Sequence, residues 1–200
     1  MKPAFTSSMI LLSHRGNQVQ NVHWNLGIQH TGSYSGSGNY GRLYFETRTF
    51  GAGAGASYDI GFSEYVPMYD GEFWNVRLWT QFPFVSASKH TTPTIYFQTQ
   101  KASDYIDDKI VHRTSGSLFP GSGSNASNAL TLTQYWCSSG SNKRLVLGGN
   151  TGSGLMTPLV NSGYSGSMQE YREWMEILDQ ETFNLHTTNP TSYVSSISPT

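Results

Sequence analysis

The sequence predicts an all-β protein, built either as a sandwich of antiparallel sheets or as a barrel. Short segments with strand-like alternation follow one another from residue 9 to residue 147, and Gly- and Ser-rich stretches separate them. No long helical period occurs before residue 165. Short strands separated by such turns are typical of sandwiches and barrels. No internal repeat of about 20–50 residues is present, so we expect neither a propeller nor a solenoid.

The first strands follow from runs of apolar residues. Residues 9–13 form a short apolar run that enters a turn. In residues 21–30, the side chains of Trp24, Leu26 and Ile28 share one face, as in a half-buried strand. Alternation of the same kind, or a short apolar run, predicts the remaining strands, at residues 40–50, 57–63, 72–80, 94–100, 129–137 and 144–147. The segments between them that are rich in Gly and Ser are predicted loops, at residues 31–39, 51–56 and 119–128.

Residues 72–80 give the clearest strand. Trp74 and Val76 lie on one face, and Arg77 and Trp79 lie on the other. An Asp-Gly pair, a hairpin signal, stands just before this strand.

Composition excludes several classes of protein. The net charge is −1 and only 12% of the 200 residues are charged, which argues against nucleic acid as a partner. Aromatic residues make up 14% of the chain, which argues against disorder. Cys137 has no second cysteine to pair with and, beside Trp136, is expected in the core. The apolar run near the N-terminus is too short for a signal peptide or a membrane span.

The last part of the chain has two interpretations. Residues 168–185 repeat apolar side chains at steps of three and four, as in an amphipathic helix. The alternative is a strand over residues 167–175, followed by a short helix from Asp179 to about His186 that ends before Asn189 and Pro190.

A family resemblance favours the second interpretation. The order G-x-M-x-E-Y-R-x-W at residues 166–174, followed by Leu178 and by E-T-F at 181–183, resembles the closing signature of laminin-G-like, concanavalin A-like domains. Residues 70–78, D-G-x-F-W-N-V-R-L, are similar to a central strand of the same family. Glu173 departs from the pattern, because the family usually has an apolar residue there.

The resemblance implies a single domain over residues 1–200. Its fold would be a jelly-roll sandwich of two antiparallel sheets, with the core at about 8–190 and a short helix near the C-terminus. The closing residues also resemble laminin-G-like modules of phage and other viral virion and tail proteins. In those modules a segment like Asn189, Pro190 and Ser192 leads out of the module, so residues 191–200 are expected to lead into a further segment.

Because the concanavalin A-like domains that the chain resembles include glucanases, a catalytic carboxylate pair is a candidate site. Glu170, Glu173 and Glu176 are spaced by three, which puts successive members on opposite faces of a strand. Arg172 is placed to neutralise Glu170. We therefore expect a structural ion pair and no enzyme, with a glycoside hydrolase on the same fold as the rival.

A Ca²⁺ site is the second kind of site to consider. The family often carries Ca²⁺ at a sheet rim, and Ca²⁺ takes six to eight oxygen ligands. No D-x-D-x-D loop and no His ligand spacing occurs, so we expect no cofactor. If Ca²⁺ does bind, the acidic residues that form its pool of ligands are Asp59, Asp70, Asp104, Asp107 and Asp108.

Aromatic residues in or beside loops are the remaining candidates for binding. Sugar sites place an aromatic ring against the sugar and flank it with polar side chains. The candidates for such contacts are Tyr34, Tyr40, Tyr65, Tyr69 and Trp79. The tryptophans expected to fill the sandwich interior instead are Trp24, Trp74, Trp136 and Trp174.

Together these features predict a non-catalytic structural or binding module of a virion or tail. Its expected partners are other virion subunits, with self-association as a homo-oligomer and glycans as a further ligand. The rival is a secreted or surface lectin or adhesin that binds glycans. Either interpretation places the protein in a virion or outside the cell.

Overall fold

The computed structural model describes residues 1–3, 8–15, 22–30, 39–49, 57–81, 94–103, 109–119, 144–148, 163–174 and 176–192. The predicted strand at 129–137 lies outside these residues, as do the predicted loop at 51–56 and most of the loops at 31–39 and 119–128. In the described part, no helix is long and apolar enough to cross a membrane.

The larger sheet has five antiparallel strands in the order β5-β4-β3-β2-β9. Its strands are β2 (Met9–Arg15), β3 (Val22–His30), β4 (Gly41–Thr49), β5 (Ser57–Phe62) and β9 (Arg144–Leu147). The first four of these lie beside their sequence neighbours, as expected for segments joined by short connections.

The smaller sheet has three antiparallel strands in the order β6-β7-β8. Its strands are β6 (Asn75–Gln81), β7 (Thr94–Ala102) and β8 (Ile110–Leu118). A third pairing joins two short strands, β1 (Lys2–Pro3) and β10 (Gly166–Ser167). The sequence did not predict β8, since its residues are mostly polar.

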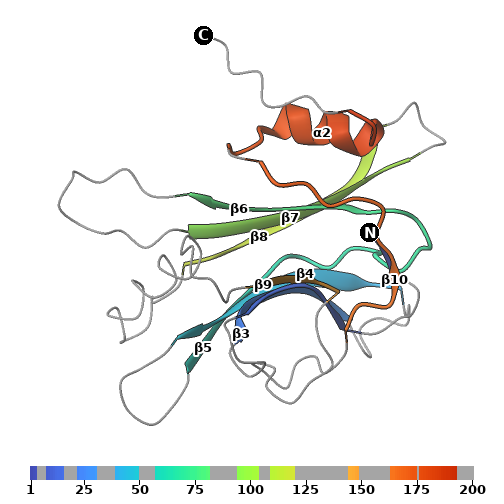
Figure 1. Ribbon diagram of the computed structural model, residues 1–200. Coiled ribbons are helices and arrows are strands. Elements are labelled where there is room, and N and C mark those ends of the chain that lie inside the picture. Colours follow the sequence, from blue (N-terminus) through green and yellow to red (C-terminus); the bar gives the residue numbers. More distant parts are fainter. Residues whose placement is uncertain are drawn as a thin grey trace.

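The two larger sheets form two layers with one hydrophobic core between them (Figure 1). Trp24 and Phe45 enter this core from the five-stranded sheet, and Ile95 and Phe97 enter it from the three-stranded sheet. The rings of Phe45 and Phe97 lie 6.4 Å apart between centroids, so the layers are in direct contact. The prediction of an all-β chain with two antiparallel sheets is confirmed.

The segment that joins the two sheets is itself part of the core. Val66, Met68, Tyr69 and Trp74 follow β5 and precede β6, and all four are buried. Trp74, 0% exposed, is among the largest fully buried side chains of the described residues. The expectation that Trp24 and Trp74 fill the interior is confirmed.

Two glycines allow the sheets to approach closely where β5 lies against β8. A Cβ on Gly61 would lie 2.6 Å from the carbonyl oxygen of Ser117. A Cβ on Gly116 would lie 2.6 Å from the carbonyl oxygen of Phe62 and 2.5 Å from the ring of Phe97. Only glycine fits at these two positions without displacing backbone.

The predicted strand at residues 167–175 is wrong. The strand there is only β10, and residues 168–174 belong to no strand. A strand needs a neighbouring backbone to pair with. Here most side chains are exposed, and Arg172 instead donates hydrogen bonds to the carbonyl oxygens of Pro190 and Ser192.

The short helix and the ion pair near the C-terminus are confirmed. The helix α2 (Gln180–Thr188) begins after Asp179, whose Oδ1 accepts a hydrogen bond from the backbone N–H of Thr182 at 2.6 Å. Arg172 pairs with Glu170 at 2.6 Å. The hydrogen bond from Arg172 lowers the pKa of Glu170.

Candidate functional site

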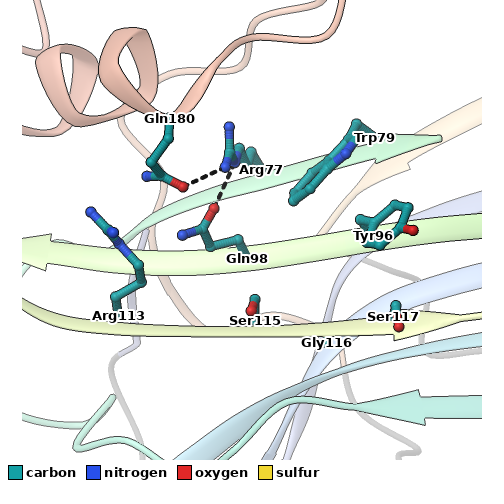
Figure 2. Close-up of a pocket in the computed structure, with 9 residues that line it drawn as sticks. All are labelled: Arg77, Trp79, Tyr96, Gln98, Arg113, Ser115, Gly116, Ser117 and Gln180. Atoms are coloured by element: carbon teal, nitrogen blue, oxygen red, sulfur yellow. Dashed lines mark hydrogen bonds between the residues drawn. The ribbon is translucent and has the colours of Figure 1, made fainter. Parts of the chain in front are cut away.

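An open groove of about 490 Å³ lies on the outer face of the three-stranded sheet, beside α2 (Figure 2). Alternation along the strands positions its lining. In β7, Ile95 and Phe97 point into the core, so Tyr96 and Gln98 point outward. Arg77 on β6 faces the same groove. The groove therefore consists of the residues that the core leaves on the far side of the sheet.

A stacked pair of aromatic rings forms one end of the groove. Trp79 and Tyr96 are directly opposite each other in the β6–β7 register. Their ring centroids are 5.4 Å apart and their planes differ by 15°. Cross-strand aromatic pairs of this kind stabilise a sheet. Both residues are half-buried, so part of each ring is exposed at the groove.

Arg77 is fixed in the middle of the groove by neutral acceptors. Its Nε donates to Oε1 of Gln98 at 2.8 Å, and its Nη2 donates to Oε1 of Gln180 at 2.7 Å (Figure 2). Its Nη1 donates to the carbonyl oxygen of Leu178 at 2.8 Å. The guanidinium carbon lies 4.4 Å from the ring centre of Trp79. These contacts hold the guanidinium in one orientation and join α2 to the sheet.

The environment of Arg77 disfavours its charge. Burial, and then the positive charge of Arg113, lower the pKa of Arg77 to about 10, although the carboxylate of Asp179 acts in the opposite direction. The guanidinium therefore stays protonated at neutral pH. The second guanidinium raises the free energy of the charged form, as expected for like charges in a partly buried site.

Arg113 lies at the helix end of the groove and is exposed. Its Nε donates to Oε1 of Gln100 at 3.1 Å, and its Nη2 donates to Oδ1 of Asn184 at 2.8 Å. The remaining polar groups of the lining include the hydroxyls of Ser115 and Ser117, opposite Gln98 and Tyr96 in the β7–β8 register. The groove thus combines amide, hydroxyl and guanidinium groups with an aromatic surface.

Of the aromatic residues that the sequence predicted as ligand contacts, Trp79 lines the groove. Tyr40 is exposed beside the start of β4, and Tyr65 has the guanidinium of Arg42 4.7 Å from its ring centre. Tyr69 is buried in the core, where burial, then the charge of Tyr164, raise its pKa. The structure does not bring these tyrosines to the groove, and Tyr34 lies outside the described residues.

Two of the acidic candidates for Ca²⁺, Asp59 and Asp70, lie in the described part of the chain. Oδ1 of Asp70 accepts hydrogen bonds from the backbone N–H of Glu72 at 3.0 Å and from Nε1 of Trp74 at 3.2 Å, and Oδ2 pairs with Lys101. Asp59 lies on β5 opposite Thr47. Asp104, Asp107 and Asp108 lie outside the described residues. Within the described ranges, no group of three His, Cys, Asp or Glu side chains is placed to hold a metal ion.

Sequence reasoning missed most of the groove. The alternation of residues 72–80 put Arg77 on the same face as Trp79, and that of residues 94–100 put Tyr96 on the same face as Gln98. Neither pattern says that the two strands are neighbours. No sequence pattern indicated that Arg113 belongs to the groove, because the strand that carries it, β8, was not predicted.

Comparison of the chain with protein-family models, with curated proteins and with solved structures found no match.

Proposed function

We propose that the protein is a non-catalytic module that binds a saccharide in the groove beside α2. The stacked pair of Trp79 and Tyr96 next to amide, hydroxyl and guanidinium groups carries this proposal. A sugar ring packs its apolar face on an aromatic surface, and its hydroxyls exchange hydrogen bonds with polar side chains around it. The open shape of the groove suits a segment of an extended glycan.

The composition of the lining supports binding over hydrolysis. A glycosidase needs two carboxyl groups on either side of the scissile bond. Among the described side chains that line the groove, none is a carboxylate.

Loss of the aromatic surface tests the proposal. We expect the wild-type protein to bind members of a glycan array, and Trp79→Ala to weaken binding to those glycans by roughly tenfold. Phe73→Ala is the matched control, because Phe73 is an exposed aromatic residue that does not line the groove. Affinities are measured by calorimetry, with circular dichroism as the check on folding. Wild-type binding that survives Trp79→Ala, or no glycan bound at millimolar concentration, would overturn the proposal.

We infer the biological setting from the sequence. The resemblance of residues 166–193, with G-S-M-Q-E-Y-R at the start and F-x-x-H-x-x-N-P-x-S-Y at the end, to laminin-G-like modules of viral virion and tail proteins supports a place in a virion or tail. In that setting the groove would face a glycan, and other surfaces would contact neighbouring subunits.

Self-assembly is the second candidate function, and the strand β9 favours it. Among the described strands, β9 has one neighbour, β2, and it carries exposed Leu145 and Leu147, the latter 51% exposed. A sheet edge with apolar side chains is a frequent place for chains to associate. We expect an oligomer by native mass spectrometry that Leu147→Lys weakens more than Ile177→Lys, a change at another exposed apolar residue. A protein that is monomeric at high micromolar concentration would exclude this function.

A further inference from the structure

Positive charge is concentrated in the groove although the chain as a whole is nearly neutral. The chain has 12 Lys and Arg against 13 Asp and Glu. Arg77 and Arg113 both line the groove, one from β6 and one from β8, with β7 between them. Because no carboxylate is among the described lining residues, the groove has a local charge of the sign that attracts anions.

The partners of the two guanidiniums orient them but do not cancel their charge. Arg77 donates to two glutamine side chains and to backbone carbonyls, and Arg113 donates to Gln100 and Asn184. The ion pairs in the described part of the chain involve other cations, Lys101 and Arg172. The acid that acts on Arg77 is Asp179, whose Oδ1 also caps the helix by accepting the N–H of Thr182.

Arg113 keeps donors for a ligand. Within the described part of the structure its Nη1 has no hydrogen-bond partner, and the side chain is exposed. Arg77, in contrast, is held on all three nitrogens. Arg113 therefore has a donor available to a ligand, whereas Arg77 is held in place and adds its charge to the potential at the same site.

We propose that the groove selects saccharides that carry an anionic group, either a carboxylate or a sulfate. The anionic group binds at Arg113, at the helix end, while a sugar ring packs on Trp79 and Tyr96 at the other end (Figure 2). A hydrogen bond between a guanidinium and an anionic oxygen is about twice as strong as a neutral one. Binding of an anion also relieves the repulsion between the two arginines. This inference rests on the proposed function.

The test uses glycans in matched pairs that differ only in charge. One pair is oligogalacturonate and its methyl ester. A second pair is a sulfated oligosaccharide and its desulfated form. The glycan array holds further pairs of both kinds. We expect the charged members to bind at least tenfold more tightly and their affinity to fall with added salt. The two pairs distinguish a carboxylate from a sulfate as the preferred group.

Variants then locate the preference. Arg113→Gln is expected to weaken binding of the charged members by roughly 10- to 100-fold and to weaken binding of the neutral members much less, so that the preference for charge is lost. Lys109→Gln is the control, because it removes the same charge from an exposed residue outside the groove. Arg113→Lys, which keeps the charge, is expected to recover part of the affinity.

The outcomes separate the two proposals. Equal binding of charged and neutral members, abolished by Trp79→Ala, would overturn the preference for anions and leave the saccharide site in place. A preference that survives Arg113→Gln would also overturn the inference. The absence of binding to any glycan would overturn both.

Discussion

Asp70 joins the segment between the two sheets to the end of β7. Its carboxylate accepts hydrogen bonds from the backbone of Glu72 and from the indole of Trp74, and it pairs with Lys101 on β7. Burial of the carboxylate acts to raise its pKa. The hydrogen bonds and the charge of Lys101 outweigh burial, so the pKa of Asp70 lies below its ordinary value.

We expect Asp70 to make stability depend on acid. Because its folded-state pKa lies below the unfolded value of about 3.9, its contribution is fully present above that value and is lost as pH falls through the folded-state pKa. Asp70→Asn should lower the free energy of unfolding at pH 7 by roughly 1 kcal/mol, since the site is partly exposed. Urea unfolding between pH 2 and 7 measures this, with Glu72→Gln as control. An acid dependence that Asp70→Asn leaves unchanged would contradict it.

Gly116 is a second residue on which packing of the layers depends. A methyl group there would overlap the carbonyl oxygen of Phe62 and the ring of Phe97. We expect Gly116→Ala to destabilise the protein by roughly 1–3 kcal/mol, as overpacking does in well-packed cores. Gly71→Asn is the comparison, because Gly71 has open space around it and asparagine tolerates its positive φ of 83°. Equal midpoints of thermal unfolding for the two variants would argue against a close contact at Gly116.

At the scale of the element, α2 is held on the sheet largely by polar side chains. Gln100, which is fully buried, donates to the carbonyl oxygen of Phe183 at 3.1 Å and to Oγ1 of Thr187 at 2.7 Å. Its Oε1 accepts from Gln180 at 3.2 Å and from Arg113. Phe183 is buried among these contacts. One amide thus connects both ends of α2 to β7 and to the groove.

Removal of that amide should loosen the helix more than the sheets. We expect Gln100→Ala to leave polar groups of Phe183 and Thr187 without this partner and to lower the free energy of unfolding by about 1–3 kcal/mol. Hydrogen exchange should show faster exchange of α2 amides than of β7 amides, because the helix opens locally. Gln81→Ala, at the exposed end of β6, is the control. It should change neither the free energy of unfolding nor the exchange of the α2 amides. Uniform acceleration across the whole chain would contradict a local role for Gln100.

At the scale of the whole molecule, the two sheets share one core with the segment between them. Trp74 enters that core from the segment, and the indole of Trp79, five residues further along, lies on the opposite face of the small sheet. Loss of the first indole therefore opens a cavity between the layers. Loss of the Trp79 indole removes a half-buried side chain from the groove and opens no cavity between the layers.

This contrast gives a prediction for two tryptophans in one segment. We expect Trp74→Ala to lower the free energy of unfolding by about 3–5 kcal/mol, and Trp79→Ala to lower it by much less. Urea unfolding followed by far-ultraviolet circular dichroism and by fluorescence measures both. The two probes should coincide for each variant, because both sheets depend on the same core. A similar loss in the free energy of unfolding for the two variants would contradict the assignment of Trp74 to the core and Trp79 to the outer face.

Features that depend on local physics could be predicted from the sequence. Period-two alternation located β3, β4, β5, β6 and β7, because successive side chains on a strand point to opposite faces. Asp179 marked the start of α2, since its side chain satisfies a backbone donor of the first turn. The pairing of Glu170 with Arg172 also followed from their spacing, although the strand predicted to carry them did not form.

The pairing of strands and the position of α2 depend on tertiary structure, because each is set by contacts between segments far apart in the chain. Residues 168–174 have a strand-like sequence but no neighbouring strand, and pairing depends on a partner that a local pattern does not specify. The groove depends on the same kind of long-range arrangement. Arg77, Arg113 and Gln180 come from three separate elements, and they meet only because α2 lies on the outer face of β6, β7 and β8 (Figure 1). Packing brings them together, and no spacing along the chain encodes it.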